Sequence, residues 1–223
     1  ETRGEVESWR VSWSPPPPES PVGRLVPLRP PGGITVPPTP VETVISQRGS
    51  SRRFTGGSIT FGQLSTLLRQ ATHTPPTDFL LPDGSMINDA YLIVNAVEEL
   101  PRGAYVFHRG EDALELLKEG DFREQARYLD LEQDLAGDAS VNVYLLADLN
   151  RVLERWGNRG YRAAQLEASI TGGRLYLASY AQGIGATGLT FYDDDVTSFF
   201  SPHAEGKSIM FLTAVGRRAK RRR

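Results

Sequence analysis

The distribution of proline limits the folded part of this 223-residue chain more than any other feature. Eleven of the sixteen prolines lie in residues 1–41, and Pro15 to Pro18 are consecutive. Proline has a fixed φ and no backbone N–H, so such a segment forms neither a helix interior nor a central strand. We therefore predict a proline-rich arm at 1–41, which is either a disordered linker or, as its apolar residues favour, a segment that lies over the domain; one folded domain at 42–216; and a basic tail at 217–223.

The hydrophobic pattern after residue 41 alternates between helical and strand periods. Thr60 and Gln63 have the spacing of a capping box, which starts a helix. Predicted helices lie at 41–47, 60–71, 111–118, 122–135, 150–156 and 161–182, and predicted strands at 91–97, 103–108, 141–147 and 208–215. The first two strands are close enough to form a hairpin. This order predicts an α+β fold with a central mixed sheet flanked by helices.

The composition excludes several kinds of chemistry. There is no cysteine, so disulfides, thiolate metal sites, iron–sulfur clusters and thiol nucleophiles are excluded. The three histidines, His73, His108 and His203, are scattered and lack the HExxH spacing of a zinc site, so we predict no metal centre. Any redox chemistry therefore requires an organic cofactor.

The charge is unevenly distributed. Residues 217–223 carry six positive charges, while the rest of the chain has a net charge of about −8. A basic tail can bind nucleic acid, an anionic membrane or an acidic peptide, but a solvated terminus is the simpler interpretation, and nucleic acid is not among the expected partners.

The chain has no apolar run long enough to span a bilayer and no secretory signal, which favours a cytoplasmic protein. Its first residue is Glu1 and not Met, as in a piece of a longer chain.

Three stretches contain residues suited to cofactor binding. Residues 47–54, Gln-Arg-Gly-Ser-Ser-Arg-Arg-Phe, offer guanidinium groups, hydroxyls and backbone N–H groups to a phosphorylated cofactor, although a solvated loop has the same composition. The glycine-rich residues 181–189 follow a helix, unlike a dinucleotide fingerprint; they permit close approach to a flat ring or simply cap the helix. At the end of the last strand, Arg217 and Arg218 could clamp a phosphate.

In this order, the stretches resemble the nitroreductase superfamily and, within it, the SagB-type peptide dehydrogenases. The family's Arg-x-Ser-x-Arg element appears at 48–52, and its Gly-x-Tyr strand, leucine-rich segment and Gly-Asp appear within 102–126. Its core helix is similar to 161–178, and its Gly-Leu-Gly and Phe-Asp-Asp stretch is similar to 183–195. The resemblance covers roughly residues 30–217.

The resemblance implies a homodimer with one FMN at each of two interface sites. Arg48 and Arg52 would hold the phosphate and the pyrimidine side of FMN, and Arg217 would reach the phosphate. Gly188 and Leu189 would lie against the flavin from the partner subunit. The complete set of implied cofactor-binding residues is Arg48, Gly49, Ser50, Arg52, Gly84, Ser85, Gly188, Leu189 and Arg217.

This chain also departs from the family pattern. The Pro-Ser-x-Gly loop beside the flavin is replaced by Pro-Asp-Gly-Ser at 82–85, and Gly172-Gly173 replaces a Gln-Asn pair, which predicts close approach to that helix. Arg155 and Trp156 stand where azoline-oxidising members carry Lys-Tyr, and arginine does not act as a base. The catalytic residue therefore stays unassigned, with Arg155, Trp156 and Tyr161 as candidates.

Three functions are consistent with the sequence. The first is an FMN-dependent dehydrogenase that oxidises an azoline or a Cα–Cβ unit of a peptide natural product. The second is an NAD(P)H-dependent nitro- or quinone reductase on the same fold. The third is a non-catalytic flavin-fold subunit that binds a peptide partner. The expected partners are accordingly a second copy of the chain, a peptide or small-molecule substrate, and other biosynthetic proteins.

Overall fold

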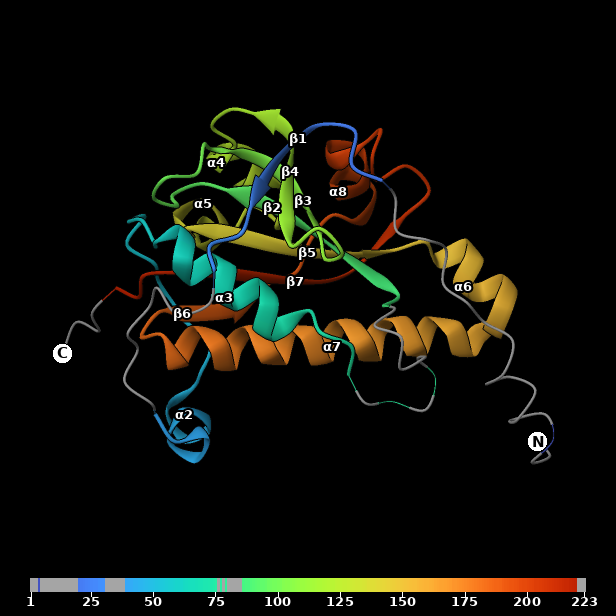
Figure 1. Cartoon of the computed structure of the whole chain (residues 1–223), viewed down its shortest axis with the longest axis horizontal. Helices are drawn as coiled ribbons and strands as arrows, with labels where there is room; N and C mark the ends of the chain where they lie inside the picture. Colours follow the sequence, from blue (N-terminus) through green and yellow to red (C-terminus); the bar gives the residue numbers. More distant parts are fainter. Residues whose placement is uncertain are drawn as a thin grey trace.

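A seven-stranded sheet forms the centre of the protein, with the strand order β1-β4-β3-β2-β5-β7-β6 (Figure 1). The computed structural model describes Gly4 and residues 20–30, 39–75, 77, 79 and 86–219. The strands are β1 (Arg24–Pro27), β2 (Asn88–Val94), β3 (Gly103–His108), β4 (Ala113–Glu119), β5 (Val141–Ala147), β6 (Gly185–Gly188) and β7 (Ser208–Gly216). The helices are α2 (Val41–Gln47), α3 (Phe61–Ala71), α4 (Arg123–Leu129), α5 (Asp134–Asp138), α6 (Leu149–Trp156), α7 (Asn158–Ala181) and α8 (Asp193–Phe200).

All pairings between these strands are antiparallel. The α+β class is confirmed, but the mixed sheet that we expected is corrected to an antiparallel one. Short turns join β2 to β3 and β3 to β4, and short turns allow only antiparallel pairing. Among the described residues, the parallel pairings are isolated bridges, Ser50 with Ala186 and Ile59 with Val97.

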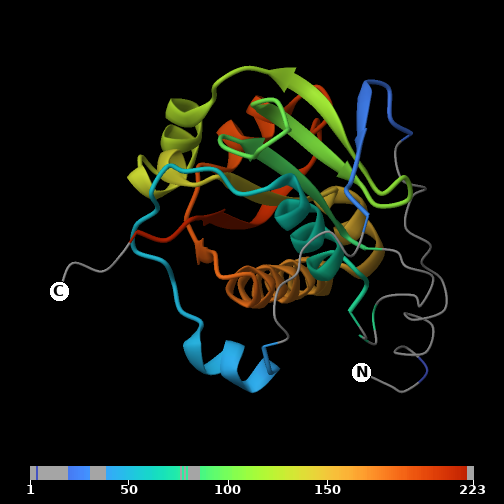
Figure 2. The same ribbon diagram turned by 60° about the vertical axis from the view of Figure 1, so that its left-hand side comes forward.

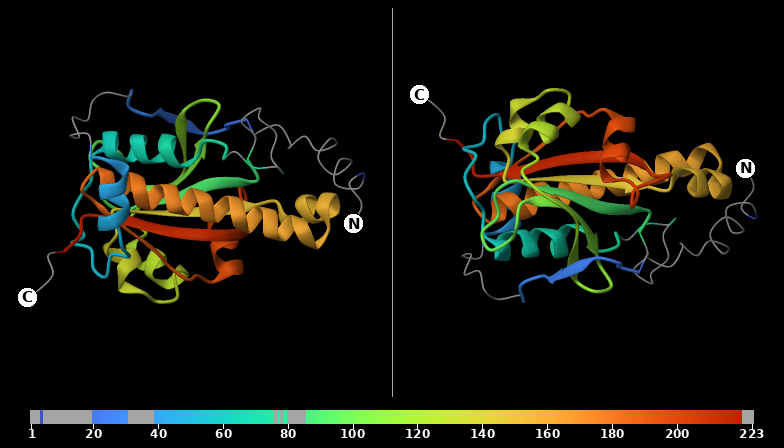
Figure 3. Two further views of the ribbon diagram at one scale, coloured as in Figure 1. Left: turned by 90° about the horizontal axis from the view of Figure 1, so that it is seen from below. Right: turned by 90° about the horizontal axis from the view of Figure 1, so that it is seen from above.

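Helices cover both faces of the sheet. On one face, α3 and α7 pack against residues such as Leu92 and Leu145, and on the other, α4, α5 and α8 pack against residues such as Tyr91 and Tyr144 (Figure 3). Successive side chains of a strand point to opposite faces, which explains this division. We refer to these as the α7 face and the α8 face. Strand β5 is buried along its whole length, as its apolar run predicts.

Several local predictions are confirmed. The helix at 41–47 forms as expected. The capping box is complete, because Gln63 N–H donates to Thr60 Oγ1 at 3.1 Å and Thr60 N–H donates to Gln63 Oε1 at 2.9 Å. The predicted hairpin is the pair β2–β3. These features depend on residues close together in the sequence, which explains why the sequence was sufficient.

Other predictions are wrong. The helix expected at 111–118 is strand β4, because pairing with β3 on one side and β1 on the other overrides the helical tendency of its leucine and glutamate residues. The helix expected at 122–135 is divided into α4 and α5, since Leu131 and Glu132 adopt φ values of 56° and 58°, which end a right-handed helix. Strand β6 was not predicted at all.

Part of the proline-rich arm lies along the edge of the sheet. Strand β1 pairs with β4, and Pro27 is tolerated there because an edge strand does not need every N–H. Leu28, the next residue, is buried in the core of the α7 face. No helix among the described residues is both long and apolar enough to cross a membrane.

Candidate functional site

The loop at 48–54 begins where α2 ends and runs past the ends of β6 and β7 (Figure 2). Ser51 N–H donates to Ala186 O of β6 at 2.9 Å, beside the parallel bridge between Ser50 and Ala186. Phe54 is buried and forms a bridge with Arg218, just beyond β7. The loop is therefore held by the backbone, while the side chains of its arginines and of Ser50 remain at the surface and Ser51 is buried.

The chain after β7 continues beside this loop in the opposite direction. Thr55 N–H donates to Arg217 O at 3.0 Å, and Ala219 N–H donates to Arg53 O at 3.1 Å. The backbone thus brings the arginines of the loop and those of the strand end together, although they are widely separated in the sequence.

Two tyrosines of α7 complete this region. Tyr176 Oη lies 3.2 Å from Ser50 Oγ and accepts a hydrogen bond from Gly188 N–H at 2.5 Å. Tyr180 Oη donates to Gly49 O at 2.7 Å. These bonds fix the loop and β6 relative to the helix.

Each tyrosine ring also lies under a guanidinium group. Arg48 Cζ is 5.9 Å from the centre of the Tyr176 ring, and Arg218 Cζ is 4.7 Å from that of Tyr180. A ring face attracts a cation without neutralising it. Both guanidinium groups are therefore oriented and still able to bind an anion.

Five arginines at this end of the molecule have exposed side chains: Arg48, Arg52, Arg53, Arg217 and Arg218. Together with Ser50, we call them the arginine cradle. Within the described part of the chain, none of the five forms an ion pair with a carboxylate. Guanidinium groups donate two parallel hydrogen bonds to phosphate and keep their charge at any accessible pH. The cradle is thus suited to a phosphorylated ligand.

Close contacts explain why residue 185 is a glycine, and the lack of contacts at Gly49 indicates open space there. A Cβ at Gly185 would lie 2.2 Å from Ser51 Oγ and 2.3 Å from Arg218 Cγ, so a side chain does not fit there. A Cβ at Gly49 would meet nothing within 4 Å. Ser51 Oγ is buried and has no hydrogen-bond partner among the described residues. Open space, an unsatisfied hydroxyl and five cations fit the phosphate end of FMN.

Most of the predicted cofactor residues lie in or beside the cradle. Arg48, Gly49, Ser50 and Arg52 form its loop, and Gly188 is linked to Ser50 through Tyr176 of the same chain. That Gly188 and Leu189 reach the flavin from the partner subunit stays a prediction; within one chain, Gly188 adjoins the loop. Leu189 is half-buried against the cores of the α8 face and of Phe54. Gly84 and Ser85 lie outside the described residues.

The two arginines after β7 point in different directions. The Arg217 side chain lies beside Gly57, with its Cδ 3.6 Å from a Cβ placed there, whereas Arg218 lies over Tyr180 and beside Gly185. In extended backbone, successive side chains alternate in direction. Sequence reasoning named both arginines at the strand end as possible phosphate ligands but assigned only Arg217 to the cofactor site.

The candidates for catalysis lie elsewhere. Arg155, Trp156 and Tyr161 are at the opposite end of α7 from the cradle (Figure 1). At 1.5 Å per residue, Tyr161 and Tyr176 are about 22 Å apart along the helix. Trp156 is also buried. These residues and the cradle of the same chain therefore cannot contact the same small ligand.

Glu167 lies between the two ends of α7 and is fully buried. Its carboxylate accepts hydrogen bonds from the backbone N–H of Ile87 and from Asn88, whose N and Nδ2 lie 3.3 and 3.2 Å from Oε1. Burial raises the pKa of Glu167 to about 7, although these hydrogen bonds and the charge of Arg109 lower it. The side chain anchors the start of β2, directly after the segment that resembles the flavin-edge loop.

Comparison with known proteins gives a consistent result. The model of the nitroreductase family matches residues 45–217. A candidate nitroreductase from Anabaena variabilis superimposes with a TM-score of 0.72 and 25% identity over 80% of this chain, which spans 38% of that protein. One from Ralstonia eutropha gives a TM-score of 0.70 and 21% identity, covering 89% of this chain and 91% of that one.

A third similar structure is a chain of the Escherichia coli microcin synthetase McbBCD complex, solved with truncated pro-MccB17 bound. It gives a TM-score of 0.66 and 16% identity, covering 99% of this chain and 83% of that one. No curated protein matches the chain. Because the family match spans most of the sequence and includes the whole arginine cradle except Arg218, the protein belongs to the nitroreductase family and is an FMN-dependent oxidoreductase.

Proposed function

We propose that this protein is an FMN-dependent dehydrogenase that oxidises an azoline or a Cα–Cβ unit of a peptide natural product. One observation carries the proposal: five exposed arginines, for which the described residues provide no carboxylate partner, lie at the same end of the molecule as Ser50 and the open space at Gly49. Such a concentration of exposed positive charge is suited to an anionic ligand, and the proposed ligand is the phosphate of FMN.

Most residues of the cradle would have a specific part in binding. Arg48 and Arg52 would hold the phosphate and the pyrimidine side of FMN, and Arg218 or Arg217 would reach the phosphate from the end of β7. The Ser50 hydroxyl and the Gly49 backbone provide further contacts, while Tyr176 and Tyr180 keep the loop in place. Bound FMN supplies a hydride acceptor at N5, and positive charge near the ring stabilises the reduced anion.

The active unit is a homodimer. Large apolar side chains are exposed on α2 and on the neighbouring α7: Val41 is 55% exposed, Ile45 53%, Tyr161 47% and Leu166 51%. Burying such a surface against a second copy is favourable. If the two α7 helices pack antiparallel, the Arg155–Tyr161 end of one copy approaches the cradle of the other. In this arrangement, the catalytic candidates of one copy would lie near the FMN site of the other.

A peptide substrate is supported by two resemblances of different kinds. The sequence resembles SagB-type dehydrogenases, and the fold is shared with a chain of the McbBCD complex, in which truncated pro-MccB17 is bound. The fold alone does not define a substrate. The second candidate, an NAD(P)H-dependent nitro- or quinone reductase, is favoured by the 25% identity to the Anabaena variabilis protein.

The first test is an absorption spectrum of the purified protein before and after incubation with FMN and desalting. We expect a flavin band, and FMN but not FAD on denaturation. The flavoprotein is then mixed with an azoline-containing peptide in the presence of O₂, or with NAD(P)H. Oxidation of the peptide without NAD(P)H supports the proposal, whereas rapid NAD(P)H oxidation with no peptide product favours the reductase. If no flavin binds under any condition, both enzymes are excluded and a peptide-binding subunit remains.

A further inference from the structure

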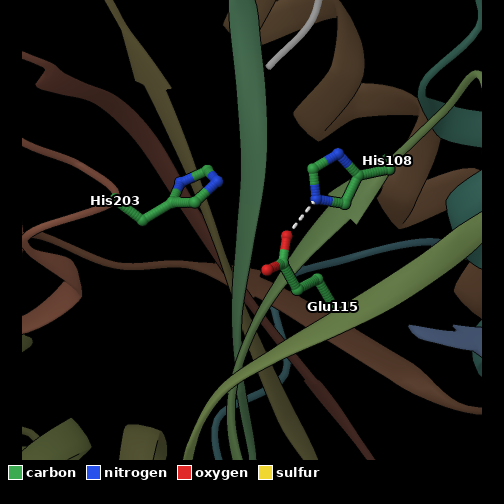
Figure 4. A group of neighbouring side chains, drawn as sticks. All are labelled: His108, Glu115 and His203. Atoms are coloured by element: carbon green, nitrogen blue, oxygen red, sulfur yellow. Dashed lines mark hydrogen bonds and ion pairs between the residues drawn. The ribbon is translucent and has the colours of Figure 1, made fainter. Parts of the chain in front are cut away.

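Two of the three histidines and a glutamate meet on the α8 face of the sheet, far from the cradle. His108 ends β3, Glu115 lies in β4, and His203 lies in the segment between α8 and β7 (Figure 4). His108 Nε2 is 2.6 Å from Glu115 Oε2, and one candidate ligand atom from each of the three side chains lies within 4.8 Å of the others. Figure 4 shows the His203 ring directed toward the other two from the opposite side.

The strand register explains part of this convergence. Residue 108 pairs with 113 and residue 106 with 115, so His108 and Glu115 are diagonal neighbours on the same face of a β-hairpin. Both side chains are buried, and His203 is half-buried above them. The site is therefore formed by a rigid hairpin and by one residue of a connecting segment.

Neighbouring groups orient two members of the cluster, Glu115 and His203. Glu115 Oε1 accepts hydrogen bonds from Val22 N–H at 3.1 Å and from Gly23 N–H at 2.5 Å, which fixes the carboxylate. On the other side, His203 Nδ1 lies 2.9 Å from Tyr91 Oη. A hydrogen-bond partner on the second ring nitrogen is the usual way in which a metal-binding histidine is oriented.

We propose that His108, Glu115 and His203 form a binding site for a divalent transition-metal ion, of which Zn²⁺ best matches the donors. Two imidazoles and one carboxylate are a frequent three-ligand set for zinc, with a fourth position for water. For bond lengths of about 2.0–2.1 Å, tetrahedral ligand atoms lie roughly 3.3 Å apart. The His108–Glu115 contact has to open by under about 1 Å, and His203 has to move inward by at most about 1.5 Å.

The surrounding charges permit a cation here. Lys207 Nζ lies behind Tyr91, 2.9 Å from Tyr91 Oη, and its charge is paired with Asp89 at 3.1 Å. The Glu115 carboxylate contributes the negative charge of the site. Because the chain has no cysteine, no thiolate competes for the ion.

The proposal departs from the sequence prediction that the histidines form no metal centre, and it does not involve the flavin. The cluster lies on the α8 face, whereas the tyrosines that support the cradle belong to α7. A bound ion would connect the β3–β4 hairpin to the segment before β7. Its expected effect is therefore on stability and not on electron transfer.

The test uses the untagged full chain, treated with a chelator and titrated with Zn²⁺ in competition with a chromophoric chelator. We expect one tight Zn²⁺ per chain and an affinity at least about 100-fold lower in His203→Gln, since a ligand is lost outright. The matched control is His73→Gln, because His73 is exposed at the end of α3 and lies outside the cluster. Its affinity should equal that of the wild type.

Two further measurements address variants that fold poorly. Tyr91→Phe removes only the hydroxyl beside His203 and should weaken Zn²⁺ binding by about 10-fold. Added Zn²⁺ should raise the melting temperature of the wild type and of His73→Gln, but not that of His203→Gln. The proposal is overturned if the wild type binds no stoichiometric Zn²⁺, or if His203→Gln binds it as the wild type does. In those cases His108 and Glu115 form only a buried hydrogen-bonded pair.

Discussion

The cradle beside α7 and the α8 face of the sheet differ in whether their charged groups are exposed and whether they have partners. At the cradle beside α7, five arginines are exposed and have no carboxylate partner among the described residues. On the α8 face, two buried acids have hydrogen-bond partners: Asp130 with Tyr144 at 3.0 Å, and Glu115 with His108 at 2.6 Å. Burying a charge without a partner costs desolvation free energy, whereas an exposed charge stays hydrated until a ligand binds. Exposed arginines without a described carboxylate partner therefore indicate the cofactor site, whereas the buried acids with partners stabilise the fold or offer ligands to a cation.

The largest effect is expected at Asp130. Burial raises its pKa to about 8, despite a hydrogen bond from Tyr144 that lowers it. Because the folded-state pKa exceeds the unfolded value, the folded state binds more protons, and stability is lost as pH rises from about 4 to about 8. Asp130→Asn should remove this loss and stabilise the protein at pH 8 by on the order of 3–5 kcal/mol. Denaturant unfolding at pH 5 and pH 8 measures it.

Glu154→Gln is the matched control for Asp130→Asn, because Glu154 is an exposed acid on α6. Its stability profile should follow that of the wild type. If Asp130→Asn also follows the wild-type profile, the buried carboxyl does not control the pH dependence, and the contrast between the faces is weakened.

The second prediction concerns the exposed side of the comparison. Arg48→Ala removes a charged donor from the cradle and should raise the Kd for FMN by about 10- to 100-fold, with little change in stability. Flavin fluorescence during titration measures the affinity. Arg24→Ala, on the edge strand β1, is the control and should bind FMN normally. An unchanged affinity in Arg48→Ala would mean that the phosphate lies elsewhere.

The third prediction compares two adjacent glycines of α7. A Cβ at Gly172 would lie 2.5 Å from Phe211 Cε1, whereas a Cβ at Gly173 would meet nothing within 4 Å. Gly172→Ala should destabilise the protein by about 1–3 kcal/mol through overpacking. Gly173→Ala should stabilise it by about 1 kcal/mol, because alanine favours the helix. Equal effects in thermal unfolding would show that Phe211 has room to move away from the helix.

The smallest effect is expected at Tyr176. Tyr176→Phe removes the hydroxyl shared by Ser50 and Gly188 but keeps the ring under Arg48. FMN affinity should fall by about 3- to 10-fold, the contribution of one or two neutral hydrogen bonds. Tyr192→Phe, at an exposed tyrosine before α8, serves as the control. A larger loss, equal to that of Arg48→Ala, would show that the tyrosine and not the arginine determines the shape of the cradle.

The sequence by itself determined the features that depend on neighbouring residues. The Thr60–Gln63 capping box, the β2–β3 hairpin and the buried strand β5 were all predicted from local signals. The arginine–serine loop was also recognisable, because its residues are consecutive. The close approach expected at Gly172-Gly173 is realised by Phe211 at Gly172. Family membership followed from the order of such motifs.

Only the tertiary structure decided what depends on distant residues. The segment that forms β4 has a helical composition and becomes a strand because β3 and β1 pair with it. The alternation of extended backbone places Arg218, and not Arg217, over Tyr180. His108 and His203 show no metal-site spacing, yet the β3–β4 register and the segment after α8 bring them together around Glu115. Such contacts are set by which strands pair and which face a side chain occupies, and neither is encoded in the periodicity of a single segment.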